Sequence, residues 1–252
     1  MKKTLVILLL LFFSQNSGLA QGFDWQYSAR LTFETPRIFI GATTDVSYLG
    51  HDADLNYAEN DIACGRFSEG SGIGYSFGIK AEYWMSANSS YYAAVTYSYS
   101  PATFLMKDSN PLDKETLLLT EYEFNSDLSY INIQGGVNYR LGGSHFRVGL
   151  GARLGFIIAN SSEHLERVIS PKDRFTFPGG THERFISEGK ISDLYTVNFL
   201  PELTLSYDLN LGLGKYASPF IRIGIPVMDI AANDPWKRYE FSIGTAIMFG
   251  LR

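Results

Sequence analysis

The stretch YEFSIGTAIMFGLR at residues 239–252 decides the fold of this chain. One face carries apolar side chains from Tyr239 to Leu251, and the other carries polar or small side chains from Glu240 to Arg252. A period of two residues is that of a β-strand, because successive side chains point to opposite faces of a sheet. The end of the chain is therefore predicted to be a strand with one apolar face.

The same two-faced alternation recurs along the chain. It is clearest at 195–211, where nine apolar residues, Pro201 among them, alternate with mostly polar ones. The remaining segments with this pattern are 38–49, 73–85, 91–106, 129–141, 145–158 and 219–228. Together with the C-terminal stretch they make eight predicted strands, and the fold class is all-β.

The links between these strands alternate in length. Residues 50–72, 107–128 and 159–194 form long links, residues 86–90, 142–144 and 212–218 form short ones, and residues 229–238 are intermediate. Outer-membrane barrels have this rhythm, with short periplasmic turns and long extracellular loops. The pair Gly142-Gly143 suits a two-residue hairpin turn, which would pair Tyr139 with Phe146 and Asn138 with Arg147.

Aromatic residues on the apolar faces form two groups along the strands. One group lies near the short turns: Tyr83, Tyr91, Tyr139, Phe146, Tyr207 and Phe249. The other lies near the long links: Tyr48, Tyr75, Tyr99, Phe156, Tyr195 and Tyr239. Two aromatic belts separated by about 8–12 residues of tilted strand match the two interfaces of a bilayer. A soluble lipocalin-like barrel, with its apolar side chains turned inward, would not need them.

At this point the chain resembles the small outer-membrane β-barrels of Gram-negative bacteria, of the OmpA transmembrane domain and OmpX type, over about residues 37–252. The resemblance implies an eight-stranded antiparallel up-and-down transmembrane β-barrel in outer-membrane lipid, inserted by the barrel-assembly machinery. That family usually ends on an aromatic residue read by this machinery. This chain ends Phe249-Gly250-Leu251-Arg252, so its insertion signal is imperfect.

The N-terminal 36 residues are predicted to lie outside this barrel domain. Residues 1–20 have the layout of a secretory signal peptide cleaved after Ala20. Residues 21–36 are either a periplasmic segment or an extra strand, since 23–34 also alternate before Thr35-Pro36 interrupts them. A ten-stranded barrel is the alternative, with a further strand from 115–125 or from Phe175–Phe185. Bacterial single-chain barrels have even strand numbers, and we favour eight.

Composition excludes several classes of protein. The chain has 252 residues and a formal charge of −5, which disfavours nucleic-acid binding. Its mean hydropathy of −0.04 is too low for a bundle of transmembrane helices. Cys64 is the one cysteine, so no internal disulfide and no multi-cysteine metal motif is possible.

No motif in the sequence predicts catalysis, a metal site or a cofactor. His51, His164 and His182 are placed in outer loops and His145 at a periplasmic turn, in no arrangement that suits a metal or a Ser–His–acid site. The run Asp52-x-Asp54-x-Asn56 begins like a calcium loop. It lacks the glycine and glutamate of an EF-hand, so a weak loop-borne calcium site is the remaining alternative to a solvated loop. Glycine spacings such as Gly149-x-Gly151 are attributed to a narrow lumen.

The inward faces are predicted to carry a charge network that plugs the lumen. It comprises five cations and five anions: Asp45, Lys80, Glu82, Arg140, Arg147, Arg153, Glu202, Asp208, Arg222 and Glu240. An eight-stranded barrel leaves little room for water, so these ions are expected to pair. Heights along the strands predict the pair Arg153–Glu202. If Leu211 pairs with Pro219, they also predict Asp208–Arg222.

The functional hypothesis is an integral outer-membrane barrel without catalytic machinery. It would present the links 50–72, 107–128 and 159–194 as surface loops, for adhesion, for contact with an extracellular ligand or for envelope structure. The first alternative is a narrow channel or transporter for small solutes. The second is an outer-membrane lipid-modifying enzyme.

Overall fold

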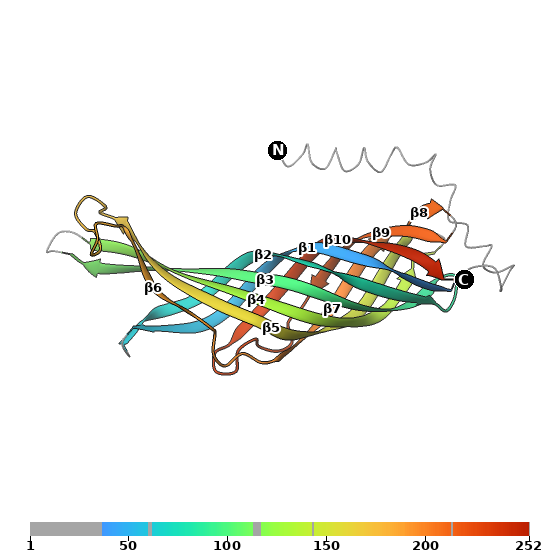
Figure 1. Ribbon diagram of the computed structural model, residues 1–252, viewed down its shortest axis with the longest axis horizontal. Helices are drawn as coiled ribbons and strands as arrows, with labels where there is room; N and C mark the ends of the chain where they lie inside the picture. The colour runs from blue at the N-terminus through green and yellow to red at the C-terminus, as the bar shows by residue number, and fades with distance from the viewer. Residues whose placement is uncertain (1–36, 60–61, 113–116, 143, 213, 252) are drawn as a thin grey trace.

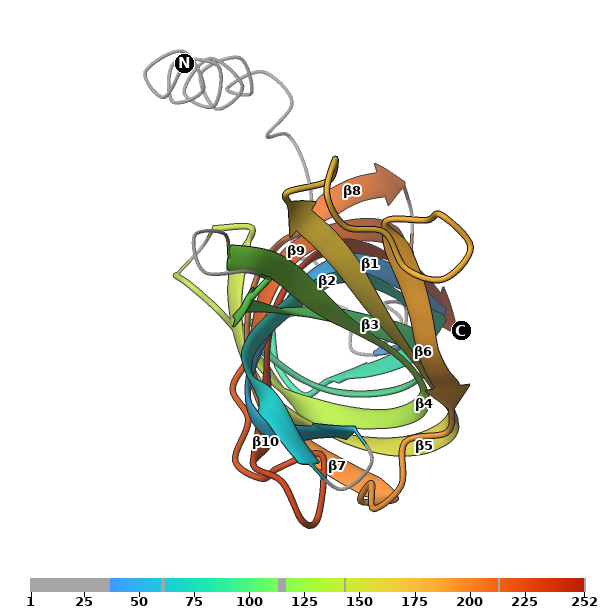
Figure 2. The same cartoon turned by 90° about the vertical axis from the view of Figure 1, so that its left-hand side faces the viewer.

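The computed structural model describes residues 37–59, 62–112, 117–142, 144–212 and 214–251, which form ten antiparallel strands. Eight of them close a barrel (Figures 1 and 2), because β10 pairs with both β1 and β9. In ring order these are β1 (Ile38–Glu59), β2 (Ile62–Trp84), β3 (Ser89–Pro111), β4 (Leu117–Arg140), β5 (Phe146–Ser170), β7 (Val197–Tyr207), β9 (Lys215–Gly224) and β10 (Trp236–Leu251). The predicted eight-stranded up-and-down barrel is confirmed.

Two short strands lie outside this ring. β6 (Glu183–Gly189) pairs with β5 beyond the barrel wall, and β8 (Leu209–Gly212) pairs with β9 at the opposite end. The ten-stranded barrel is therefore wrong. Residues 115–125 do not supply an extra strand, since the described part from Leu117 onward is the start of β4.

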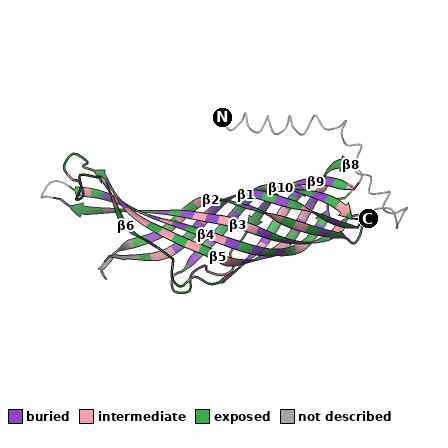
Figure 3. Cartoon of the chain, in the orientation of Figure 1, coloured by how far each residue is buried: buried purple, intermediate pink, exposed green. Residues whose placement is uncertain are grey.

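Exposed and buried residues alternate along the strands (Figure 3), and in the membrane-facing part the exposed side chains are mostly apolar whereas the buried ones are mostly polar. Ile73 is 71% exposed on the outside, whereas Ser242 is fully buried on the inside. Water does not stabilise such an exterior, but the hydrocarbon of a bilayer does, and a closed barrel leaves no unpaired sheet edge in it. The chain is an integral outer-membrane β-barrel.

Both aromatic belts lie on the exterior, as predicted. Tyr83 and Tyr139 are exposed near the short turns, and Tyr48 and Tyr239 are exposed at the other end. Outward apolar side chains between these belts define the membrane-facing band. It comprises residues 38–48, 73–85, 91–99, 131–141, 146–158, 195–207, 217–227 and 239–251.

The prediction that residues 50–72, 107–128 and 159–194 form long loops is wrong, because most of each segment is β-strand. Residues 50–59 continue β1 and 62–72 begin β2, so the calcium-like run at 52–56 and Cys64 lie in a hairpin. β3 and β4 likewise occupy most of 107–128, and β5 runs on to Ser170. Beyond the band, β2 stops pairing with β3 at Gly70 and Phe104, so β3, β4, β5 and β6 project as a separate sheet (Figure 1). We call this sheet the wing.

The polarity of the alternation inverts where the strands leave the membrane, and this explains the error. On β4, Glu121 and Glu123 point outward while Tyr122 and Phe124 are buried. Outside the bilayer the exterior faces water and the interior becomes a conventional hydrophobic core. A continuous two-residue alternation with an apolar exterior therefore identifies only the membrane-facing part of each strand.

Two predicted registers are also wrong. Arg140 pairs with Arg147 and Tyr139 pairs with Val148, so the register differs by two residues from the predicted pairing. The turn is longer than two residues, since the Leu141 amide donates to the Phe146 carbonyl. Leu211 does not pair with Pro219 among the described pairings, because β7 and β8 share one register along β9, in which Ser206 pairs with Phe220 and Leu209 pairs with Ala217.

The signal-peptide and N-terminal segment predictions fall on residues 1–36, outside the described residues, and so does Arg252. Within the part of the chain that the structure describes, no helix is long and apolar enough to span a membrane.

Candidate functional site

All ten predicted lumen charges point into the barrel. Nine of them are buried, and Lys80 is partly exposed. Their side chains converge because each lies on an inward position of its strand, and eight strands bring facing walls within reach of a long side chain. The structure divides them into two connected groups stacked along the barrel axis.

The first group, near the periplasmic end, is built around Glu82 on β2 and Asp208 next to β7. Arg147 contacts both carboxylates, with its Nη2 2.8 Å from an Asp208 oxygen. Arg140 reaches the second Asp208 oxygen at 3.0 Å, and Lys80 lies 3.9 Å from Glu82. Ser90 and Tyr216 each donate a hydroxyl to Glu82, at 2.6 and 3.0 Å. Ser218 donates its hydroxyl to Asp208 at 3.1 Å. Each of the two buried carboxylates therefore accepts hydrogen bonds from both cationic and neutral donors.

The second group, at mid-barrel, is built around Arg153 on β5. Its guanidinium donates to both oxygens of Glu240 at 2.9 Å and also contacts Glu202. Arg222 contacts Asp45 at 2.5 Å and lies 3.6 Å from Glu202. Glu202 thus stands between two arginines, and each arginine also contacts a second carboxylate.

The structure brings together one of the two predicted pairs. Arg153 and Glu202 are in contact. Asp208 and Arg222 belong to different groups, so the prediction that they pair is wrong. The cause is the register at the second turn, where β7 and β9 pair Ser206 with Phe220.

Arg238 is a buried lumen cation that the sequence analysis missed. It donates to the Ser100 hydroxyl at 3.0 Å and lies 4.7 Å from the centre of the Tyr130 ring. Its position two residues before Glu240 places it on the same inward face, which is the signal that could have identified it. Arg238 links the mid-barrel charges to the layer above.

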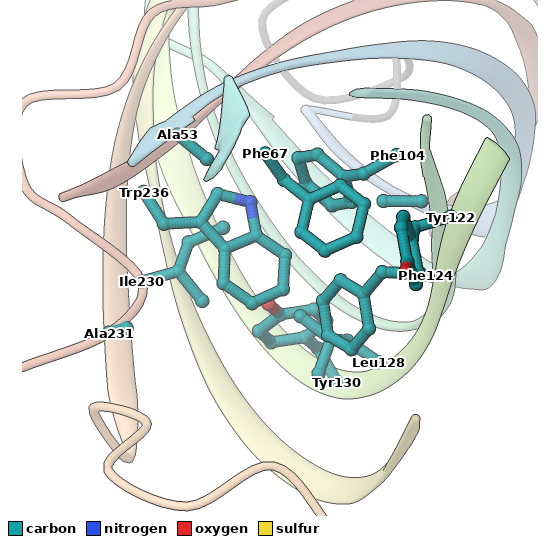
Figure 4. Packing of buried hydrophobic residues seen from close by; sticks show 11 residues of the cluster. Ala53, Phe67, Phe104, Tyr122, Phe124, Leu128, Tyr130, Ile230, Ala231 and Trp236 are labelled. Carbon is teal, nitrogen blue, oxygen red and sulfur yellow. The ribbon is translucent and has the colours of Figure 1, made fainter. Parts of the chain in front are cut away.

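That upper layer is an aromatic cluster in the extracellular half of the lumen, here called the aromatic cap. Figure 4 shows its side chains gathered inside the barrel. Phe104 and Trp236 are inaccessible to solvent, and their rings lie 5.7 Å apart in an edge-on arrangement. The full set is Ala53, Phe67, Ala102, Phe104, Tyr122, Phe124, Leu128, Tyr130, Ile230, Ala231 and Trp236. The cap was missed because most of its members lie in stretches predicted to be loops.

The four histidines are not brought together. His51, predicted in an outer loop, is buried under the cap, where its Nδ1 accepts a hydrogen bond from the Trp236 indole at 2.9 Å. His164 packs edge-on against Phe124, with ring centres 4.5 Å apart. His145 stands at the periplasmic end beside Tyr207. In the calcium-like run, Asp54 contacts Arg66.

A cavity of about 270 Å³ opens beside the aromatic cap at the extracellular end. Two smaller voids lie within the charged levels, of about 20 Å³ near Tyr92 and about 10 Å³ near Arg153. A single water needs about 10–15 Å³, so neither void has room for anything much larger than one water molecule.

Comparison with known proteins finds similar chains among solved structures. No protein-family description and no curated sequence matches the chain. Among solved structures, Neisserial surface protein A has a TM-score of 0.35 and 14% identity, over 84% of this chain and 97% of its own. Ail, the attachment invasion locus protein of Yersinia pestis, has a TM-score of 0.31 and 10% identity, over 84% and 98%. The outer-membrane protease OmpT from Escherichia coli has 0.34 and 10%, over 85% and 96%. At identities of 10–14%, these similarities concern the fold alone.

Proposed function

We propose that this outer-membrane β-barrel is closed to solutes and acts as a surface platform whose wing contacts a partner outside the cell. The observation that carries the proposal is the length of the strands. β1 to β5 have 22–25 residues each. A tilted strand crosses a bilayer with about 9–11 residues, so about half of each strand is left for the extracellular side.

Exposed apolar side chains on the wing support a contact role. Leu117, Leu119 and Phe185 are 58%, 41% and 53% exposed, and Ile169 is 38% exposed. The strand register places Leu117, Leu119 and Phe185 on the outward face beyond the membrane-facing band, and Ile169 lies at the register shift beside Leu119. Apolar groups grouped on a water-facing surface are typical of an interaction site, because a partner buries them.

Three features of the lumen support closure over the channel alternative. Two levels of paired charge and the aromatic cap follow one another along the axis. The voids between the charged side chains are water-sized. An ion crossing this path would have to displace buried, paired groups, which is costly.

Conductance in a planar bilayer tests the closure. We expect no steady ohmic current from the wild type. A steady current that changes in the Glu240→Gln variant would overturn closure and favour the channel.

Adhesion tests the platform. Cells that express the triple variant Leu117→Ser/Leu119→Ser/Phe185→Ser should lose the autoaggregation or adhesion to immobilised protein shown by cells with the wild type. Thr103→Ser, an exposed polar position on the same sheet that pairs with Asn125 and lies away from these residues, is the matched control. Equal adhesion by cells with and without the barrel would contradict the platform role.

A further inference from the structure

We propose that the cavity beside the aromatic cap binds a neutral sugar ring, either as a free monosaccharide or as the terminal unit of a glycan. The inference deepens the proposed function by naming a ligand class for the extracellular face, and it rests on that function for the outward orientation of the site.

The cavity is formed where three separate parts of the chain meet. Leu55, Asn56 and Phe67 come from the β1–β2 hairpin, and Phe124, Ser162 and His164 come from β4 and β5. The third wall is made by two connecting segments, 190–193 and 231–236. Backbone bonds hold these two segments together, since the Ala232 amide donates to the Asp193 carbonyl at 2.7 Å. The site is therefore built from paired backbone and is largely preformed.

Aromatic rings make the floor of the cavity. Phe67, Phe124 and Trp236 are each at most 7% exposed and line it from different strands. The Phe67 and Phe124 rings lie 5.9 Å apart and are tilted by 36°. The Trp236 indole is fixed by its hydrogen bond to His51 (Figure 4 shows Trp236 beside Phe67). Trp236 is inaccessible to solvent and backs this floor, so a ligand ring would contact the small exposed parts of Phe67 and Phe124.

Polar side chains make the rim. Asn56, Lys190, Asp193 and Asn233 are exposed, so the cavity opens to the extracellular solvent above its buried floor. Asp234, Ser162 and Ser192 complete it. Lysine and the amide nitrogens donate hydrogen bonds, whereas the carboxylates and amide oxygens accept them. His164 is on the same wall, and burial lowers the pKa of its imidazole, which favours the neutral form.

This combination selects a neutral ring with hydroxyl groups at its edge. An anion would be repelled by Asp193 and Asp234, whereas a cation would be attracted by these carboxylates and opposed only by Lys190, so the primary amine is the comparator that competes with the sugar. An apolar ring would cover the rim groups without pairing them, which costs free energy for each group. A hydroxyl both donates and accepts, and the C–H face of a pyranose packs on aromatic floors. The volume of about 270 Å³ admits a single ring of this size.

Saturation-transfer NMR on the full barrel in lipid nanodiscs tests the inference. The probes are the methyl glycosides of glucose, galactose, mannose and N-acetylglucosamine, with indole, glucuronate and a primary amine as comparators. At least one glycoside should receive saturation, strongest at the C–H protons of one ring face. Absence of transfer to every glycoside and to oligosaccharides that end in these sugars would overturn the proposal. So would preferential binding of a comparator.

Two variants locate the binding. Asp234→Asn and Asn233→Ala should each weaken the binding of the glycoside about 10-fold, the factor that corresponds to 1.4 kcal/mol. Glu188→Gln, an exposed change on β6, should leave it unchanged, and unchanged binding in both rim variants would contradict this site. Tighter binding of an oligosaccharide than of its terminal glycoside indicates a glycan, and equal binding indicates a free sugar. Because these measurements need neither a closed lumen nor adhesion, their failure is distinguishable from failure of the proposed function.

Discussion

Arg153 and Glu240 are joined across the lumen by two hydrogen bonds of 2.9 Å. They lie on β5 and β10, which are not neighbours in the ring. This bidentate pair therefore links facing walls that the backbone ladder does not connect directly. Since the exterior contacts lipid, the hydrophobic effect of water cannot hold the transmembrane part of the interior together, and paired charges fill that role.

Removal of one mid-barrel carboxylate should have a moderate cost. In Glu202→Ala, Arg153 keeps Glu240 and Arg222 keeps Asp45. We expect the free energy of unfolding to fall by about 1–3 kcal/mol, the cost of an unsatisfied buried partner. Urea titration in detergent micelles, followed by the mobility of the folded form on unheated gels, measures it.

Removal of both carboxylates should cost more than the sum of the single changes. Glu202→Ala/Glu240→Ala leaves Arg153 buried without either of its carboxylates, so its cost should exceed the sum of the two single costs by a coupling energy of about 0.5–3 kcal/mol. Glu123→Ala is the control, because its contact with Arg167 is partly exposed and should contribute less than about 1 kcal/mol. Strict additivity of the two lumen changes would contradict the network.

The aromatic cap should contribute to stability as a conventional core does. Phe104 is fully buried, and its ring covers Gly70, where an added Cβ would lie 2.6 Å from it. Phe104→Ala should lower the free energy of unfolding by about 3–5 kcal/mol. Leu105→Ala, its outward and exposed neighbour, should change it by less than about 1 kcal/mol. Equal effects would mean that the cap is not a packed core.

Stability should fall as the pH falls from 7 to 5, because of His51. This residue lies beyond the membrane-facing band. Burial, and then the positive charge of Arg238, lower the pKa of His51 from 6.5 to about 3. Below pH 6.5 the unfolded chain takes up a proton that the folded chain does not. The free energy of unfolding should therefore fall with a slope that approaches about 1.4 kcal/mol per pH unit as the pH drops below 6.5.

Substitution of His51 and of the partly buried His164 tests whether these residues cause the pH dependence of stability. His51→Gln keeps an acceptor for Trp236 and should remove most of the slope. The pKa of His164 is also lowered by burial, so His164→Gln should remove a further part. The urea midpoint at pH 7 and at pH 5 gives the comparison. An unchanged slope in His51→Gln would assign the pH dependence to other groups.

Trypsin added to intact cells should cut the segment between β5 and β6. Lys172 and Arg174 are exposed there, and Lys190 is exposed just after β6. Arg184 should be spared, because it lies within β6 and contacts Glu166 at 2.6 Å. Lys215 should be spared as well, since it lies at the periplasmic end, paired with Phe249. Cleavage at these sites only after permeabilisation of the outer membrane would reverse the assigned orientation.

The membrane-facing part of the fold was predictable from residue alternation alone. Lipid requires an apolar exterior, so each segment such as 239–251 carries the pattern in its own residues. The ten lumen charges were predictable for the same reason, because a period of two assigns every intervening residue to the interior. The extracellular strands were not, since their polarity inverts in water, as Tyr122 and Glu123 show.

The sequence by itself determined the all-β class, the eight-stranded ring, the aromatic belts and the identity of the inward charges. All of these follow from local periodicity. The tertiary structure alone decided which charges meet, as when Asp208 reaches Arg140 and Arg147 instead of Arg222. It also decided that Phe67, Phe124 and Trp236 form the floor of one cavity. Contacts across a barrel depend on the register at every turn, and a register difference of two residues at the turn beginning at Gly142 changes the partners without changing the pattern of faces.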